Sequence, residues 1–146
     1  MLKIPIDILL VDDETDFVEM LSLRLADAGH RVRAAYTGEQ GLEALAQAEP
    51  DVVILDIRMP GIDGITALKA MKAAHPVVEI ILLTGHGTID TAVEGLKSGA
   101  FDYVQKPADF ADLLDKLAAA RARKAEQEER IRRAEERALL RRTGGI

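Results

Sequence analysis

The chain has 146 residues, of which 48% are apolar, and a formal net charge of −6. This length suits one domain that is stable without crosslinks, and the absence of cysteine excludes disulfides, thiolate metal sites and cysteine nucleophiles. No apolar run is long enough to span a membrane and no signal peptide opens the chain, so we expect a soluble, cytoplasmic protein.

Short runs of branched apolar residues alternate with longer segments in which apolar residues recur every three or four positions. The short runs are typical of parallel strands buried on both faces, and the periodic segments are typical of helices that cover a sheet. In chain order, the expected strands are Ile6–Val11, Arg31–Ala35, Val52–Leu55, Ile80–Leu83 and Asp102–Gln105. The helices expected after them in turn are 17–28, Gly41–Ala48, Ile65–Ala73, Ile89–Leu96 and a last helix over about 109–142. The alternation predicts a doubly wound α/β fold with a five-stranded parallel sheet and an extended C-terminal helix.

Charge divides the chain into two parts. Residues 1–115 carry 9 Lys/Arg and 20 Asp/Glu, whereas residues 116–146 carry 10 and 5. The acidic part would repel phosphates, which argues against direct nucleic-acid binding by the body. We therefore expect one domain over residues 1–120 and a basic helical extension over residues 121–146. The extension has few apolar residues at the positions that a coiled-coil seam needs. Two alternatives therefore remain: the chain forms a homodimer through this helix, or the helix is solvated and frays.

Acidic residues follow the first and third predicted strands. Asp12 and Asp13 come directly after the first strand, and Asp56 comes directly after the third. In a parallel sheet, ligands bind beyond the carboxyl ends of the strands, so these carboxylates would meet where the strand order reverses. Three carboxylates in a partly desolvated cup repel one another, and hard oxygen ligands favour Mg²⁺. The alternative is that Asp12 and Asp13 only cap the next helix, which leaves Asp56 unexplained.

Thr84 and Lys106 follow the fourth and fifth predicted strands. A hydroxyl and an ammonium at the same edge of the sheet are donors suited to phosphoryl oxygens. Taken singly, Thr84 before Gly85 is typical of a turn, and Lys106 before Pro107 is typical of a solvated surface residue. Matching chemistry at four strand ends instead favours a phosphoryl site. The three histidines share no ligand spacing, so we expect no zinc site.

The residues around these strand ends closely resemble the receiver domain of two-component response regulators, over about residues 5–120. The matching segments are Ile8–Glu14, Leu55–Gly64, Leu82–Gly85 and Gly99–Pro107. The stretch Gly87–Val93 is most similar to receivers of enhancer-binding transcription activators. The resemblance implies a flavodoxin-like strand order, 2-1-3-4-5, and a phosphoprotein of phosphorelay signal transduction.

Carried onto this sequence, the resemblance implies that Asp56 is the phosphoacceptor. It would receive the phosphoryl group from the phosphohistidine of a sensor histidine kinase or from a phosphotransfer protein. Mg²⁺ would be held by Asp13 directly, by Asp12 partly through water, by Asp56, and by the backbone carbonyl of Arg58. The phosphoaspartate would be lost only slowly, so the expected chemistry is that of a switch and not of an enzyme.

The resemblance also implies how the switch responds. Thr84 would hydrogen-bond the transferred phosphoryl group, Lys106 would pair with another of its oxygens, and Tyr103 would be the switch aromatic whose ring swings inward. The Lys106–Pro107 peptide bond would be cis. The response would appear on the face made by the fourth helix, fifth strand and fifth helix, and the C-terminal helix would signal it to a protein partner.

Three other functions use a similar layout. A Mg²⁺-dependent hydrolase with an aspartyl nucleophile would need a second carboxylate two residues after Asp56, where Arg58 stands. A flavin carrier of the same strand order would need a hydroxyl-rich phosphate loop after the first strand, where this sequence is acidic. A docking scaffold that is never phosphorylated would need neither Thr84 nor Lys106. No DNA-binding or ATPase domain fits in residues 122–146, so we expect a stand-alone receiver or an N-terminal piece of a longer chain.

Overall fold

A computed structural model of the chain describes residues 4–85 and 89–144. Its five strands form one parallel sheet in the order β2-β1-β3-β4-β5, which confirms the predicted doubly wound α/β fold and its strand order. Gly87 and Thr88, at the start of the stretch most similar to activator receivers, lie outside the described residues. The elements are β1 (Asp7–Val11), α1 (Thr15–Asp27), β2 (Arg31–Ala35), α2 (Gly38–Gln47), β3 (Val52–Asp56), α3 (Gly64–Ala74), β4 (Glu79–Thr84), α4 (Ile89–Lys97), β5 (Asp102–Gln105) and α5 (Phe110–Arg142).

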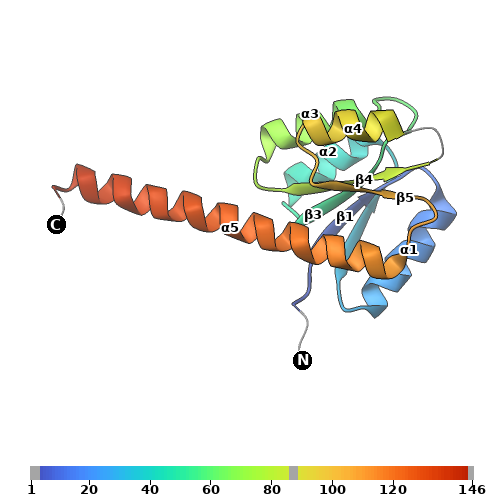
Figure 1. Cartoon of the computed structure of the whole chain (residues 1–146), viewed down its shortest axis with the longest axis horizontal. Helices are drawn as coiled ribbons and strands as arrows, with labels where there is room; N and C mark the ends of the chain where they lie inside the picture. The colour runs from blue at the N-terminus through green and yellow to red at the C-terminus, as the bar shows by residue number, and fades with distance from the viewer. Residues whose placement is uncertain (1–3, 86–88, 145–146) are drawn as a thin grey trace.

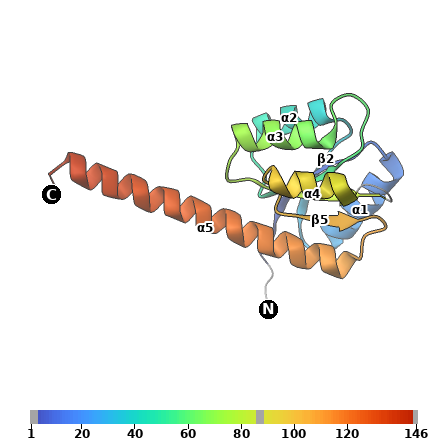
Figure 2. The ribbon, with the colours of Figure 1, turned by 45° about the horizontal axis from the view of Figure 1, so that its top comes forward.

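Helices cover both faces of the sheet (Figure 1). Helices α1 and α5 lie on one face, and α2, α3 and α4 lie on the other, as the turned view in Figure 2 also shows. Strands β3 and β4 are buried along their whole length. Successive side chains of a strand point to opposite faces, so Val53 and Leu55 pack on the side of α2–α4, while Val52 and Ile54 pack on the side of α1 and α5. Burial on both faces explains why these strands are continuous apolar runs in the sequence.

Helix α2 begins at Gly38, three residues before the predicted start at Gly41. Thr37 is its N-cap, and the Thr37 hydroxyl accepts a hydrogen bond from the Gln40 N–H at 3.0 Å. In return, Gln40 Oε1 accepts the N–H of Tyr36 at 2.9 Å. This pair of bonds is a variant of the capping box and stabilises a first turn that lacks apolar residues.

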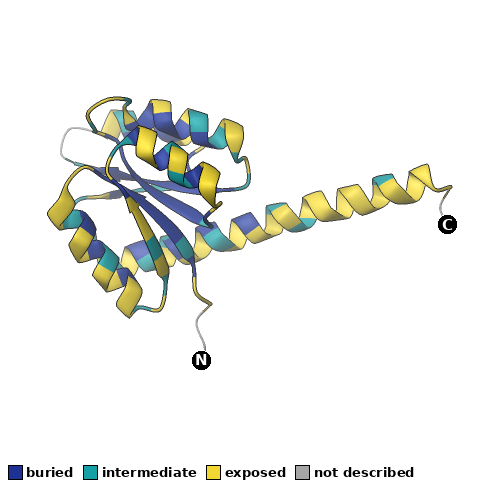
Figure 3. Ribbon diagram, turned by 180° about the vertical axis from the view of Figure 1, so that it is seen from behind, coloured by how far each residue is buried: buried dark blue, intermediate teal, exposed yellow. Residues whose placement is uncertain are grey.

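Helix α5 packs on the body only in its first half, and the rest projects away from it (Figure 3). At about 1.5 Å per residue, its 33 residues extend over roughly 50 Å. Lys124 is its last buried residue, and its Nζ lies 3.4 Å from the Asp51 carboxylate and 3.7 Å from that of Glu49. An ionic contact therefore ends the packed part of the helix. Within the described residues no helix, α5 included, is both long and apolar enough to cross a membrane.

Candidate functional site

Four of the five strands bring a polar residue to the same edge of the sheet. Asp12 comes directly after β1, and Lys106 comes directly after β5. Asp56 and Thr84 are the last residues of β3 and β4. Asp56 is paired in register with Leu83, so β4 extends one residue, Thr84, beyond the end of β3. Because the strands are parallel, their carboxyl ends meet at one edge, and the structure brings the predicted site residues together there.

Asp12, Asp13 and Asp56 form an acidic cluster at this edge. Each offers one carboxylate oxygen, and these oxygens all lie within 4.8 Å of one another. Asp12 and Asp56 are buried, whereas Asp13 is exposed. Hard oxygen ligands gathered so closely fit Mg²⁺. The cluster borders a pocket of about 280 Å³, which is lined by Asp13, Glu14, Asp56, Ile57, Arg58, Gly85 and Lys106.

The Lys106 ammonium lies among these carboxylates. Its Nζ is 2.6 Å from Asp12 Oδ2, 3.0 Å from Glu14 Oε1 and 3.7 Å from Asp56 Oδ2. The same nitrogen lies 4.4 Å from the centre of the Phe17 ring. Burial by itself would lower the pKa of Lys106, but the hydrogen bonds to Asp12 and Glu14, together with the charges of Asp12 and Asp56, outweigh burial and raise the pKa. Lys106 therefore stays charged at neutral pH.

Asp56 is harder to ionise than an ordinary carboxyl. Burial raises the pKa of Asp56 to about 6, and the neighbouring Asp12 carboxylate adds to the rise. Lys106 opposes the rise, as does the backbone N–H of Arg58, which donates to Asp56 Oδ1 at 3.2 Å. Among the described residues around the pocket, carboxylates outnumber cationic side chains, so the site has an excess of negative charge that a divalent cation would offset.

Thr84 carries a hydroxyl with no protein partner in the described ranges. The residue is fully buried, and its Oγ1 makes no hydrogen bond within residues 4–85 and 89–144. A buried hydroxyl without a partner is costly, and a ligand oxygen would satisfy it. The Lys106 N–H donates to the Thr84 carbonyl oxygen at 2.7 Å. The strand ends that carry the two predicted phosphoryl donors are therefore bonded directly to each other.

Tyr103 lies on β5 and is half-buried. It packs against the hydrophobic cluster on the side of α2–α4. The Lys116 ammonium donates to the Tyr103 carbonyl oxygen at 3.0 Å and lies 6.0 Å from the centre of its ring. The role of Tyr103 as the switch aromatic stays a prediction. The Lys106–Pro107 peptide bond is cis, the form that the resemblance implies.

Two residues of the site have no role in the prediction from sequence. Glu14 forms an ion pair with Lys106, and Phe17 places its ring against the same ammonium. The signal for Glu14 was its position directly after Asp12 and Asp13, but its partner is 92 residues away. Phe17 has the spacing of a core residue of α1, and nothing in its pattern indicates a contact with a charge.

The comparison with known proteins identifies the family of the chain. The family described as the response regulator receiver domain matches residues 8–118. The regulatory protein AtoC of Escherichia coli (strain K12) is 46% identical over 106 residues, which cover 73% of this chain and 23% of AtoC. The DNA-binding transcriptional regulator NtrC of the same strain is 44% identical over 100 residues, which cover 68% of this chain and 21% of NtrC. The chain thus spans about a quarter of the length of the curated relatives it matches.

A solved structure shows the same fold over nearly its whole length. The response regulator receiver domain protein from Clostridium thermocellum has a TM-score of 0.79 and 34% sequence identity, and the match covers 82% of this chain and 97% of that one. The fold, the acidic cluster and the family match over more than half of the chain lead to one assignment. This chain belongs to the response regulator receiver domain family.

Proposed function

We propose that this receiver accepts a phosphoryl group on Asp56 from a sensor histidine kinase or a phosphotransfer protein, in a reaction that depends on Mg²⁺. One observation carries the proposal. The Asp56 carboxylate lies beside those of Asp12 and Asp13, with one oxygen of each within 4.8 Å of the others, and its Oδ2 is 3.7 Å from the Lys106 ammonium. Membership of the family implies phosphoryl acceptance, and the oxygen ligands support the choice of metal.

The transfer makes one bond and breaks one. An oxygen of the Asp56 carboxylate attacks phosphorus as the bond from phosphorus to the histidine nitrogen breaks, and the electron pair of that bond stays on the imidazole. Asp12, Asp13, Asp56 and the Arg58 carbonyl would hold Mg²⁺, which when bound supplies positive charge to the phosphoryl oxygens. Lys106 supplies a second positive charge. Because its pKa is about 6, Asp56 is mostly ionised at neutral pH and able to attack.

Thr84 and Lys106 then connect the new charge to the fold. Phosphorylation adds negative charge and three acceptor oxygens, to which the Thr84 hydroxyl at the end of β4 and the Lys106 ammonium directly after β5 would donate. Tyr103 is on β5 beside α5, so a shift of these strand ends would reach the face made by α4, β5 and α5. Helix α4 carries three exposed apolar residues, Ile89, Val93 and Leu96.

The surroundings of Asp56 favour a switch over a catalyst. A hydrolase with an aspartyl nucleophile needs a second carboxylate two residues later, and the exposed Arg58 occupies that position. We therefore propose that the phosphoaspartate is lost only by slow hydrolysis. The relatives AtoC and NtrC are regulators several times longer than this chain. In this chain, the net charge of −11 over residues 1–115 argues against direct contact of the body with nucleic acid.

Phosphorylation by a small donor tests the proposal. The chain is incubated with acetyl phosphate and Mg²⁺, and the intact mass is measured. We expect a gain of one phosphoryl group per chain, located on the peptide that contains Asp56, and no gain when EDTA removes the metal. Equal labelling in EDTA would contradict the metal dependence, and a label located elsewhere would contradict the choice of Asp56.

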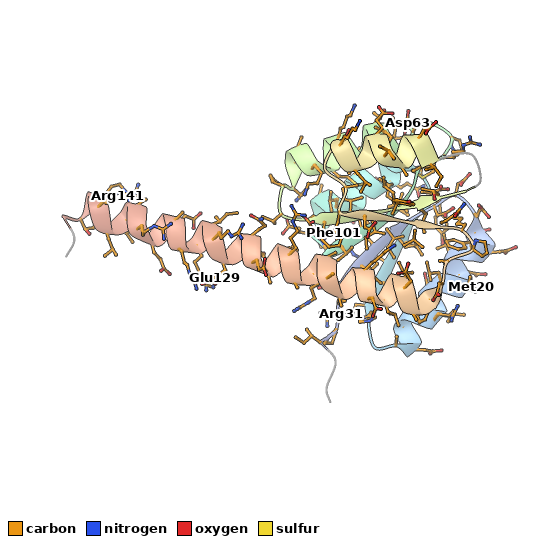
Figure 4. The ribbon with its side chains drawn as sticks, in the orientation of Figure 1. Met20, Arg31, Asp63, Phe101, Glu129 and Arg141 are labelled. Atoms are coloured by element: carbon orange, nitrogen blue, oxygen red, sulfur yellow. The ribbon has the colours of Figure 1, made fainter. Side chains whose placement is uncertain are left out.

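Removal of residues 129–146 tests whether the projecting helix carries the output. Glu129 and Arg141 extend into solvent from this part of α5 (Figure 4), whereas Lys124 still contacts the body and pairs with Glu128 at 3.5 Å. A cut after Glu128 therefore spares the packed part of the helix. We expect phosphorylation to change the oligomeric mass of the full chain, measured by light scattering, and to leave the shortened chain unchanged. Identical behaviour of the two chains would contradict this output route.

A further inference from the structure

The β3–α3 loop, residues 57–63, is fixed at two points. At its base, the Gly64 N–H donates to the Ile57 carbonyl oxygen at 2.9 Å. Near its far end, the Ile62 N–H donates to Glu39 Oε1 at 3.0 Å. Glu39 is in α2, which contributes no residue to the pocket around the acidic cluster. The second point therefore ties the loop to a separate element of the fold.

Two glycines allow the loop to approach α2 this closely. Gly61 has a φ of +80°, and a Cβ at this position would lie 2.9 Å from Glu39 Oε1. On the α2 side, a Cβ at Gly38 would lie 2.5 Å from Ile62 Cγ1. The loop backbone thus rests directly on the first turn of α2, in a contact that side chains at either glycine would push apart.

The charge on Glu39 strengthens this contact. The hydrogen bond from the Ile62 N–H lowers the pKa of Glu39, and the bond from its own backbone N–H lowers it further. Glu39 also lies in the first turn of α2, where the helix dipole favours a carboxylate. Glu39 is therefore ionised at neutral pH, and an ionised acceptor makes a stronger hydrogen bond than a neutral one.

The segment held between the two points contains Arg58. Its backbone N–H donates to Asp56 Oδ1 at 3.2 Å, and its carbonyl is a Mg²⁺ ligand under the proposed function, on which this inference rests. We propose that Glu39 is a positioning residue for the phosphoacceptor site. By holding Ile62, it keeps the Arg58 carbonyl and the Asp56 carboxylate in the arrangement that binds Mg²⁺.

A titration of the full chain with Mg²⁺, followed by the NMR shifts of backbone amides, tests this role. For Glu39→Ala we expect the dissociation constant for Mg²⁺ to rise about tenfold, the effect typical of losing a residue that orients a metal ligand. Glu39→Gln keeps an oxygen acceptor for the Ile62 N–H, so it should restore most of the affinity.

Two variants of α2 serve as matched controls. Glu43→Ala removes a carboxylate from the exposed side of the same helix, and we expect it to leave the dissociation constant unchanged. Gln40→Ala removes the side chain that accepts the Tyr36 N–H before the first turn of α2, so it should lower the melting temperature without weakening Mg²⁺ binding.

Three outcomes would overturn the inference. If Glu39→Ala binds Mg²⁺ as tightly as Glu43→Ala, Glu39 has no positioning role, and the proposed function is untouched. If Gln40→Ala weakens binding as much as Glu39→Ala, the effect comes from the stability of α2 and not from the contact with Ile62. If the unmodified chain binds no Mg²⁺, the proposed function is wrong and this inference is wrong with it.

Discussion

Asp56→Asn is expected to abolish phosphoryl labelling under conditions in which the unmodified chain takes up one group. Asparagine keeps the shape of the side chain, but its amide oxygen is a far weaker nucleophile than a carboxylate oxygen. Intact mass after incubation with acetyl phosphate and Mg²⁺ measures the loss. Asp115→Asn makes the same chemical change at an exposed position of α5 and should label normally. Full labelling of the Asp56 variant would place the phosphoacceptor elsewhere.

The same substitution should stabilise the metal-free protein at neutral pH. Burial raises the pKa of Asp56 from its ordinary value of 3.8 to about 6 in the folded chain. Between these two values the folded chain binds more protons than the unfolded chain, so its stability falls as the pH rises through this window. Well above pH 6 the whole cost is present, on the order of 3 kcal/mol, and asparagine, which does not ionise, avoids it.

Denaturant unfolding in EDTA at two pH values measures this difference. We expect Asp56→Asn to be more stable than the unmodified chain near pH 7.5 and the two to be nearly equal below about pH 3, where the Asp56 carboxyl is largely protonated in both states. A gain of the same size at both pH values would show that it comes from packing and not from the charge.

The elements of the fold could be predicted because their signals are local. The last helix was expected over about 109–142 and spans Phe110–Arg142, since Asp109 caps its start, accepting the Asp112 N–H at 3.2 Å, and neither glycine nor proline interrupts it. The predicted start of α2 at Gly41 is wrong by three residues. Two of the four residues from Gly38 to Gly41 are glycines, which have low helix propensity, and the cap at Thr37 outweighs this weakness.

The site could be predicted only as far as the topology dictates it. Parallel strands bring their carboxyl ends to one edge whatever the loops do, so Asp56 and Thr84, which end the adjacent strands β3 and β4, had to be neighbours once the strand order was known. Which carboxylate Lys106 contacts depends on the paths of separate loops. The pairing of Glu14 with Lys106 and the support that Glu39 gives to the β3–α3 loop therefore appear only in three dimensions.

Gly64→Ala is expected to destabilise the fold by roughly 3 kcal/mol and to slow the phosphorylation of Asp56. Gly64 is the first residue of α3, and a Cβ there would lie 2.5 Å from the Asp56 carbonyl oxygen and 2.6 Å from the Ile57 Cα. Both are backbone atoms, so no rotation of a side chain can relieve the overlap. Alanine is otherwise preferred over glycine in helices by about 1 kcal/mol, so a loss of stability would itself show that the steric contact dominates.

Gly29→Ala separates a general loss of stability from a displaced phosphoacceptor. Gly29 has a φ of +96°, which costs an alanine about 1 kcal/mol, but no heavy atom of the described residues beyond its chain neighbours would lie within 4 Å of the new Cβ. It precedes β2, at the edge of the sheet opposite the site. Unfolding curves should show both variants destabilised, while labelling rates at a temperature where both are folded should fall only for Gly64→Ala. A displaced Asp56 carboxylate would lose its alignment with the incoming phosphorus, which slows labelling. Equal labelling rates for Gly64→Ala and Gly29→Ala would therefore mean that the loop accommodates the added carbon without moving Asp56.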